Sequence, residues 1–145
     1  LETIICDNPY PSEYLGEAAW NQLVLKAFFT EKDINRIIGL DKRANKPLAD
    51  TLCDFARERR AASRTIPPQL WRCVAPFINA ENFDDIQKAA NSTDIVEQKA
   101  ALLACNSSNY PPAKTLLNQY PEINNTIQSG KLNWHSLAQK EILVA

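Results

Sequence analysis

The chain has 145 residues, of which 45% are hydrophobic and 23% charged, so it is long enough to bury the core of one ordinary globular domain. Its formal net charge is −1 at pH 7, and no overall field attracts it to nucleic acid or to an anionic membrane. No run approaches the roughly 20 apolar residues that a transmembrane helix needs. We therefore expect one domain over 1–145, with no membrane-spanning segment and no general affinity for nucleic acid.

Helix signals recur along the whole chain, and no segment has a sustained β pattern. Prolines and small polar residues stand at the expected helix starts, only three glycines occur, and no segment alternates polar and apolar residues for long. The pattern predicts helices over 13–29, 31–38, 47–64, 69–75, 81–90, 94–105, 111–119, 121–129 and 134–143. The fold class that we expect is therefore all-α.

Four local signals set the expected boundaries of the shorter helices. Thr30 is the expected cap of the helix over 31–38, and Gly39 is expected to end that helix. Residues 40–43 would then form a loop. Ser92 or Thr93 is expected to cap the helix over 94–105, and Asn133 to cap the last helix.

The helix over 13–29 is apolar most of the way round its cylinder, which is typical of a central helix. Its Trp20 is then either a core residue or a platform for a ligand. The segment 45–77 is the most highly charged part of the chain. Asn45 is a good N-cap, Pro47 suits a first helical turn, and Pro67 and Pro68 prevent the helix from continuing.

An arginine row stands near the end of the expected helix over 47–64. Arg57, Arg60 and Arg64 are spaced three and four residues apart, so one helix face would present three guanidinium groups if the helix extends as far as Arg64. Such a row can form a site for an anion or for an acidic patch on a partner. It can equally be the solvated end of a helix whose dipole favours basic residues at that end.

Cysteine and histidine offer little chemistry in this chain. Four cysteines are present and none forms a CxxC pair, so we expect small buried thiols in a reducing compartment, with disulfides as the alternative. The single histidine, His135, combines with no cysteine at a zinc-ligand spacing. We therefore expect no catalytic residues, no metal and no cofactor.

Successive helix pairs follow one another at a period of roughly 30 residues from 81 onward, within the range of stacked helical repeats. The run STDIVEQKAALLACNSSNYPPAKTLL over 92–117 resembles a HEAT-like unit, with a small cap, an Ala/Leu-rich helix, a polar loop, a proline and a Leu-rich helix. We therefore expect HEAT-like helix pairs over 81–130. Their hairpins would stack as a short right-handed solenoid.

Three further segments carry a family resemblance. They read AAWNQLVLKAFF (18–29), IIGLDKRANKPLADTLCDFARERRAASR (37–64) and LWRCVAPF (70–77), and together they resemble the EboA family of metabolite-traffic proteins over about 18–117. The positions that match the motifs are Trp20, Asn21, Lys26, Asp41, Arg43, Asn45, Glu58, Arg59, Arg64, Trp71 and Arg72. Family members extend further at the N-terminus, which agrees with the absence of methionine here, so we expect the native N-terminal part to be missing.

The resemblance implies a helical, repeat-like fold and brings no established catalytic residues. Its motif residues also have structural interpretations, in which Glu58 and Arg72 form an ion pair and the tryptophans fill the core. Our first functional hypothesis is a non-catalytic binding or adaptor protein that helps to traffic a biosynthetic metabolite. The alternative is an enzyme that acts on a small aromatic or prenylated intermediate, with His135, Glu58 with Arg59, or Cys73 beside Arg72 as candidate groups.

The expected binding surface combines the arginine row with nearby aromatic residues. The residues that we expect to contact a ligand or partner are Arg57, Arg59, Arg60, Arg64, Trp71 and Arg72. The expected partners are proteins of the same biosynthetic or transport gene cluster, or an apolar small metabolite. We expect a cytoplasmic protein that meets the inner membrane only through partners.

Overall fold

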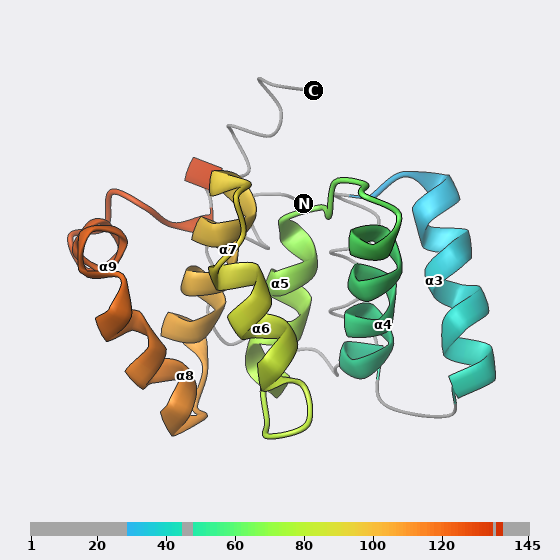
Figure 1. The fold of residues 1–145 in the computed structure, drawn as a ribbon, viewed down its shortest axis with the longest axis horizontal. Coiled ribbons are helices and arrows are strands. Elements are labelled where there is room, and N and C mark those ends of the chain that lie inside the picture. Colours follow the sequence, from blue (N-terminus) through green and yellow to red (C-terminus); the bar gives the residue numbers. More distant parts are fainter. Residues whose placement is uncertain (1–28, 45–47, 135, 138–145) are drawn as a thin grey trace.

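The computed structural model describes residues 29–44, 48–134, 136 and 137, and within these ranges it contains helices and no strand (Figure 1). Seven α-helices and two 3₁₀ helices lie in the described ranges: α3 (Glu31–Ala44), α4 (Leu48–Ala61), α5 (Gln69–Val74), η2 (Ala75–Phe77), α6 (Phe83–Ala90), α7 (Ile95–Ser107), α8 (Pro111–Leu116), η3 (Leu117–Gln119) and α9 (Pro121–Gln128). The all-α class is confirmed. Trp20, most of the helix expected over 13–29, and His135 lie outside the described residues.

Helix α3 begins where the sequence predicted and ends later. The backbone N–H of Asp33 donates to Thr30 Oγ1 at 3.2 Å, so Thr30 is the cap. The predicted end at Gly39 is wrong, because the helix continues to Ala44 and places Asp41 within it. A glycine inside a helix costs only about 1 kcal/mol, and packing of α3 against α4 compensates for such a cost.

Helix α4 ends three residues before the predicted position. It stops at Ala61, and Ser63 then adopts a left-handed conformation with φ 56° that turns the chain away from the helix axis. Arg64 therefore lies outside α4, and the expected three-arginine helix face is not formed. Ile66 is buried after the turn, and Pro68 leads into α5 as predicted.

The later helices agree with the predicted order, with one changed cap. Asp94, rather than Ser92 or Thr93, is the N-cap of α7, because its side chain accepts a hydrogen bond from the N–H of Val96 at 3.0 Å. Gly130 has φ 80° just after α9, which suits a glycine at a helix end. Asn133 accepts from the N–H of Ser136 at 2.8 Å, as expected for a cap.

The core is centred on α7. This helix packs against α5, α6, α8 and α9, and residues 100–105 are all buried, so no side of its middle turn faces water. Ala100, Ala101 and Ala104 are small, which lets neighbouring helices approach closely, while Leu102 is fully buried among them. Our prediction from the sequence did not single out α7 as central, although its apolar residues lie on nearly every side, which is typical of a buried helix.

Figure 1 shows α3 and α4 at one end of the row of helices, α8 and α9 at the other end, and α5, α6 and α7 between them. Among the described residues, no helix is long and apolar enough to cross a membrane. The right-handed HEAT-like stack and the single domain over 1–145 remain predictions.

Candidate functional site

The arginines of α4 each contact a carboxylate, and these carboxylates lie on different helices. Arg57 donates to both oxygens of Asp85 in α6 at 2.8 and 2.7 Å, and also to Asp54 at 2.7 Å. Arg59 binds Asp33 of α3 at 3.0 Å. These ion pairs join α4 to α6 and to α3, so the side chains of Arg57 and Arg59 hold neighbouring helices together.

Arg57 also has an altered protonation equilibrium. The hydrogen bonds to Asp85 raise the pKa of Arg57 above its ordinary value, and burial opposes this change. A raised pKa in the folded state stabilises the fold at every pH below the unfolded value, so this contribution is fully present at neutral pH. Arg57 is therefore a permanently charged cross-link in which Asp85 is the buried partner.

Arg60 and Arg64, both predicted site residues, line the same pocket. They line a shallow pocket of about 240 Å³ with Ser63, Thr65, Ile66, Ser92, Asp94 and Glu97. Arg60 donates to both carboxylate oxygens of Glu97, at 3.2 and 3.4 Å, and the Glu97 side chain is 3% exposed. Two arginines and two carboxylates share this pocket, so its charges cancel and a simple anion site does not follow from them.

Trp71 and Arg72 lie in the interior, away from the exposed side of α4. Their relative exposures are 0% and 1%. The guanidinium of Arg72 stands 5.4 Å from the ring centroid of Trp134, which is the geometry of a cation–π contact. Among the described residues, the indole N–H of Trp71 has no hydrogen-bond partner, and neither has the amide group of buried Gln69. A ligand role for Trp71 and Arg72 remains a prediction, and it would require access to this interior.

Two of the candidate catalytic groups, Glu58 and Cys73, lie in surroundings that fit a structural role. Glu58 is exposed and accepts two hydrogen bonds from Arg36 of α3, at 2.8 and 2.6 Å. Cys73 is fully enclosed, and burial raises the pKa of its thiol from 9.0 to about 12, which opposes formation of a nucleophilic thiolate. Among the described residues, no group of three His, Cys, Asp or Glu side chains could hold a metal ion.

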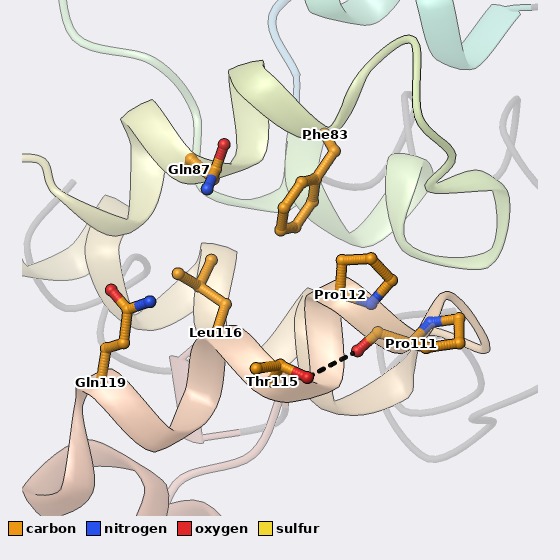
Figure 2. A pocket seen from close by; sticks show the side chains of 7 residues that line it. All are labelled: Phe83, Gln87, Pro111, Pro112, Thr115, Leu116 and Gln119. Carbon is orange, nitrogen blue, oxygen red and sulfur yellow. Dashed lines mark hydrogen bonds between the residues drawn. The ribbon is translucent and has the colours of Figure 1, made fainter.

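A second pocket, of about 440 Å³, lies between α6 and α8. We call it the α6–α8 pocket; Figure 2 shows the residues that line it, which are Phe83, Gln87, Pro111, Pro112, Thr115, Leu116 and Gln119. None of these side chains is charged or titrates near neutral pH. The pocket was not predicted, because its two walls come from helices more than twenty residues apart in the chain.

The apolar part of the α6–α8 pocket is built from rings and one leucine. The ring of Phe83 meets the ring of Tyr110 edge to face, with centroids 5.5 Å apart and an interplanar angle of 69°. Pro111 and Pro112 form the first turn of α8, and Leu116 is buried one turn later. In Figure 2, Phe83 and Pro112 approach one another from opposite walls.

The polar part of the same pocket consists of two amides. Gln87 extends from α6 and Gln119 from η3, and Figure 2 shows both near the end of the pocket that lies away from Pro111. Both residues are exposed, and their amides have no hydrogen-bond partner among the described residues. The hydroxyl of Thr115 is already used, because it donates to the carbonyl oxygen of Pro111 at 3.2 Å.

Comparison with known protein families finds a match for the N-terminal half of the chain. The family model described as metabolite traffic protein EboA matches residues 1–75. The chain belongs to the EboA family. The resemblance stated from the sequence motifs is thereby confirmed, although the match begins and ends earlier than the expected 18–117. Comparisons with curated proteins and with solved structures find no match.

The EboA match has a clear relation to the described helices. It includes α3, α4 and α5 and ends at the first residue of η2. Arg57, Arg59, Arg60, Arg64, Trp71 and Arg72 all lie inside it. The α6–α8 pocket lies in the part of the chain that follows the match, and the carboxylates of Asp85 and Glu97 connect that part to α4.

Proposed function

We propose that this EboA protein is a non-catalytic binding module that holds a biosynthetic metabolite while it is moved between partners. The observation that carries this proposal is the α6–α8 pocket, whose lining has apolar walls and two amides but no acid, base or thiol. A binding site needs shape and a few polar groups, whereas general acid–base or nucleophilic chemistry needs a titratable group. Membership of a metabolite-traffic family is consistent with such a role.

The contacts between alternate helices support a helical-repeat interpretation of the fold. Among the even-numbered helices, the Arg57–Asp85 pair joins α4 to α6, and the α6–α8 pocket lies between α6 and α8. Among the odd-numbered helices, α7 packs against both α5 and α9. Contacts between every second helix are what stacked helical hairpins produce, and stacked hairpins offer extended surfaces to partners. We propose that proteins of the same gene cluster bind on these surfaces, in the cytoplasm or beside the inner membrane.

The proposal is tested in the host of this protein. The gene is deleted and then restored, and the intermediates of its cluster are quantified by mass spectrometry in separated cell fractions. We expect deletion to leave the amounts made similar but to change their distribution, because the protein moves an intermediate and does not make it. Unchanged distribution in the deletion strain would refute a traffic role, and loss of one chemical conversion would indicate an enzyme.

A further inference from the structure

The α6–α8 pocket contains no charge with which an ionic ligand could pair. Its seven lining residues are two prolines, two glutamines, a phenylalanine, a threonine and a leucine. Removing an ion from water without a counter-charge is costly, so this lining favours a neutral ligand. The start of α8 reinforces this preference, because Pro111 and Pro112 replace two of the N–H groups that would otherwise attract an anion.

The apolar walls favour a flat ligand. Tyr110 supports one side of the Phe83 ring edge to face, and this contact restricts the rotation of Phe83. Figure 2 places the Phe83 ring across from Pro112, with Leu116 beside the space between them. A phenyl ring and a proline ring that approach from opposite walls offer flat apolar surfaces to a planar aromatic group. A volume of about 440 Å³ lies within the usual size range of small-molecule sites.

The amides of Gln87 and Gln119 can orient a bound ligand through hydrogen bonds. Each amide offers an N–H donor and a carbonyl acceptor, so together they can pair with a ligand amide, lactam or carbonyl group. They come from separate elements, α6 and η3, and lie at one end of the pocket, whereas Phe83 and Pro112 lie closer to the other end. A ligand with one polar edge and one aromatic body would satisfy both ends at once.

From these observations we propose that the α6–α8 pocket binds a neutral, planar aromatic compound whose carbonyl or amide edge pairs with Gln87 and Gln119. This inference rests on the proposed binding function and names the ligand class of that site. Binding is reversible and non-covalent, because the lining offers no thiol, amine or carboxylate, and the hydroxyl of Thr115 already donates to the carbonyl oxygen of Pro111.

The test uses three naphthalene probes of similar size and different charge, which are neutral 2-naphthamide, anionic 2-naphthoate and cationic 2-naphthylmethylammonium. Their affinities for the full chain are measured by ligand-observed NMR titration. We expect 2-naphthamide to bind about tenfold or more tightly than either ion, which corresponds to about 1.4 kcal/mol. Equal or tighter binding of either charged probe would overturn the inference, and so would no binding of 2-naphthamide at millimolar concentration.

Two variants locate the binding site, and a third is the matched control. Gln87→Leu and Gln119→Leu keep the size of the side chain but remove its amide, so each should weaken 2-naphthamide binding about two- to tenfold. Asn118→Ala removes an exposed amide from η3 that does not line the pocket, and it should leave the affinity unchanged. Equal affinities in all four proteins would place the probe elsewhere. A polyproline peptide that displaces the probe and binds more tightly would assign the groove to a protein partner and overturn the small-molecule assignment.

Native mass spectrometry of the protein purified from its host separates failure of this inference from failure of the proposed function. A cargo held by the wild type and lost from the Gln87→Leu/Gln119→Leu variant supports both. A cargo held equally by both proteins leaves the binding function in place and rejects this pocket as its site.

Discussion

Two nitrogens of the Arg57 guanidinium in α4 donate hydrogen bonds to the two carboxylate oxygens of Asp85 in α6. The Asp85 side chain is only 7% exposed, whereas the Arg57 side chain is 53% exposed. This pair connects a helix inside the EboA match to a helix that follows it. Asp85 therefore depends on Arg57 for most of its charge compensation, whereas Arg57 can turn to water. The asymmetry predicts that the two single substitutions have different consequences.

We expect Arg57→Ala to lower the free energy of unfolding by about 1–3 kcal/mol, because it leaves the carboxylate of Asp85 buried without its main donor. Urea unfolding followed by circular dichroism measures the change. Lys88→Ala is the control. Lys88 pairs with Asp84 on the exposed side of α6, the helix that carries Asp85, and this pair should contribute no more than about 0.5 kcal/mol. Asp85→Asn should cost less than Arg57→Ala, and the reverse order would contradict this assignment of roles.

Arg60 and Arg64 provide a second comparison within one pocket. Arg60→Ala leaves the buried carboxylate of Glu97 without its donor and should cost about 1–3 kcal/mol. Arg64 is exposed and stands outside α4, so Arg64→Ala should change stability by no more than about 0.5 kcal/mol. Thermal unfolding of both variants under the same conditions measures the difference. Similar costs for the two would mean that Arg64 has a structural role which its exposure does not indicate.

The buried thiols predict slow chemical modification. Burial raises the pKa values of Cys53, Cys73 and Cys105 from 9.0 to about 12, so these thiols stay protonated in the folded state at pH 8. Iodoacetamide labelling followed by peptide mapping should find these three sites protected in native protein and labelled in urea. Rapid labelling of Cys73 in native protein would show that α5 opens readily.

The same pKa values predict how stability changes in alkaline solution. The folded pKa lies above the unfolded pKa, so the protonated thiol stabilises the fold fully below pH 9, and this contribution is lost as pH rises from 9 to 12. Cys73→Ala removes one such group. The difference in unfolding free energy between wild type and this variant should therefore shrink above pH 9, and a difference that is constant between pH 7 and 10.5 would contradict the raised pKa.

Leu102 tests whether α7 is the centre of the core. Leu102→Ala should cost about 2–5 kcal/mol, because the fully buried side chain leaves a cavity among helices that pack on several sides. Ile95 lies at the start of the same helix and is 50% exposed, so Ile95→Ala should cost about 0.5 kcal/mol or less. Chemical unfolding of both variants provides the comparison. Equal costs would show that the middle of α7 is less tightly packed than its burial indicates.

Helix boundaries show how far local rules extend. Thr30 and Asn133 cap their helices as the sequence predicted, because a cap depends on backbone groups three residues away. Gly39 does not end α3, because its intrinsic cost is small beside the packing of that helix. Ser63 ends the regular path of α4 instead, and nothing in its residue type signals a left-handed conformation.

The sequence by itself determined the all-α class, most helix starts, the burial of three thiols and the family. These features depend on the residues nearest in the chain, or on motifs that can be read directly. Only the tertiary structure decided which acids pair with the arginines of α4 and that Phe83 and Leu116 share a pocket. Arg57 and Asp85 are 28 residues apart, and Arg60 and Glu97 are 37 apart, so these contacts depend on how helices pack in space. A row of arginines predicts charge, whereas the position of its partners determines whether that charge faces a ligand or holds the fold together.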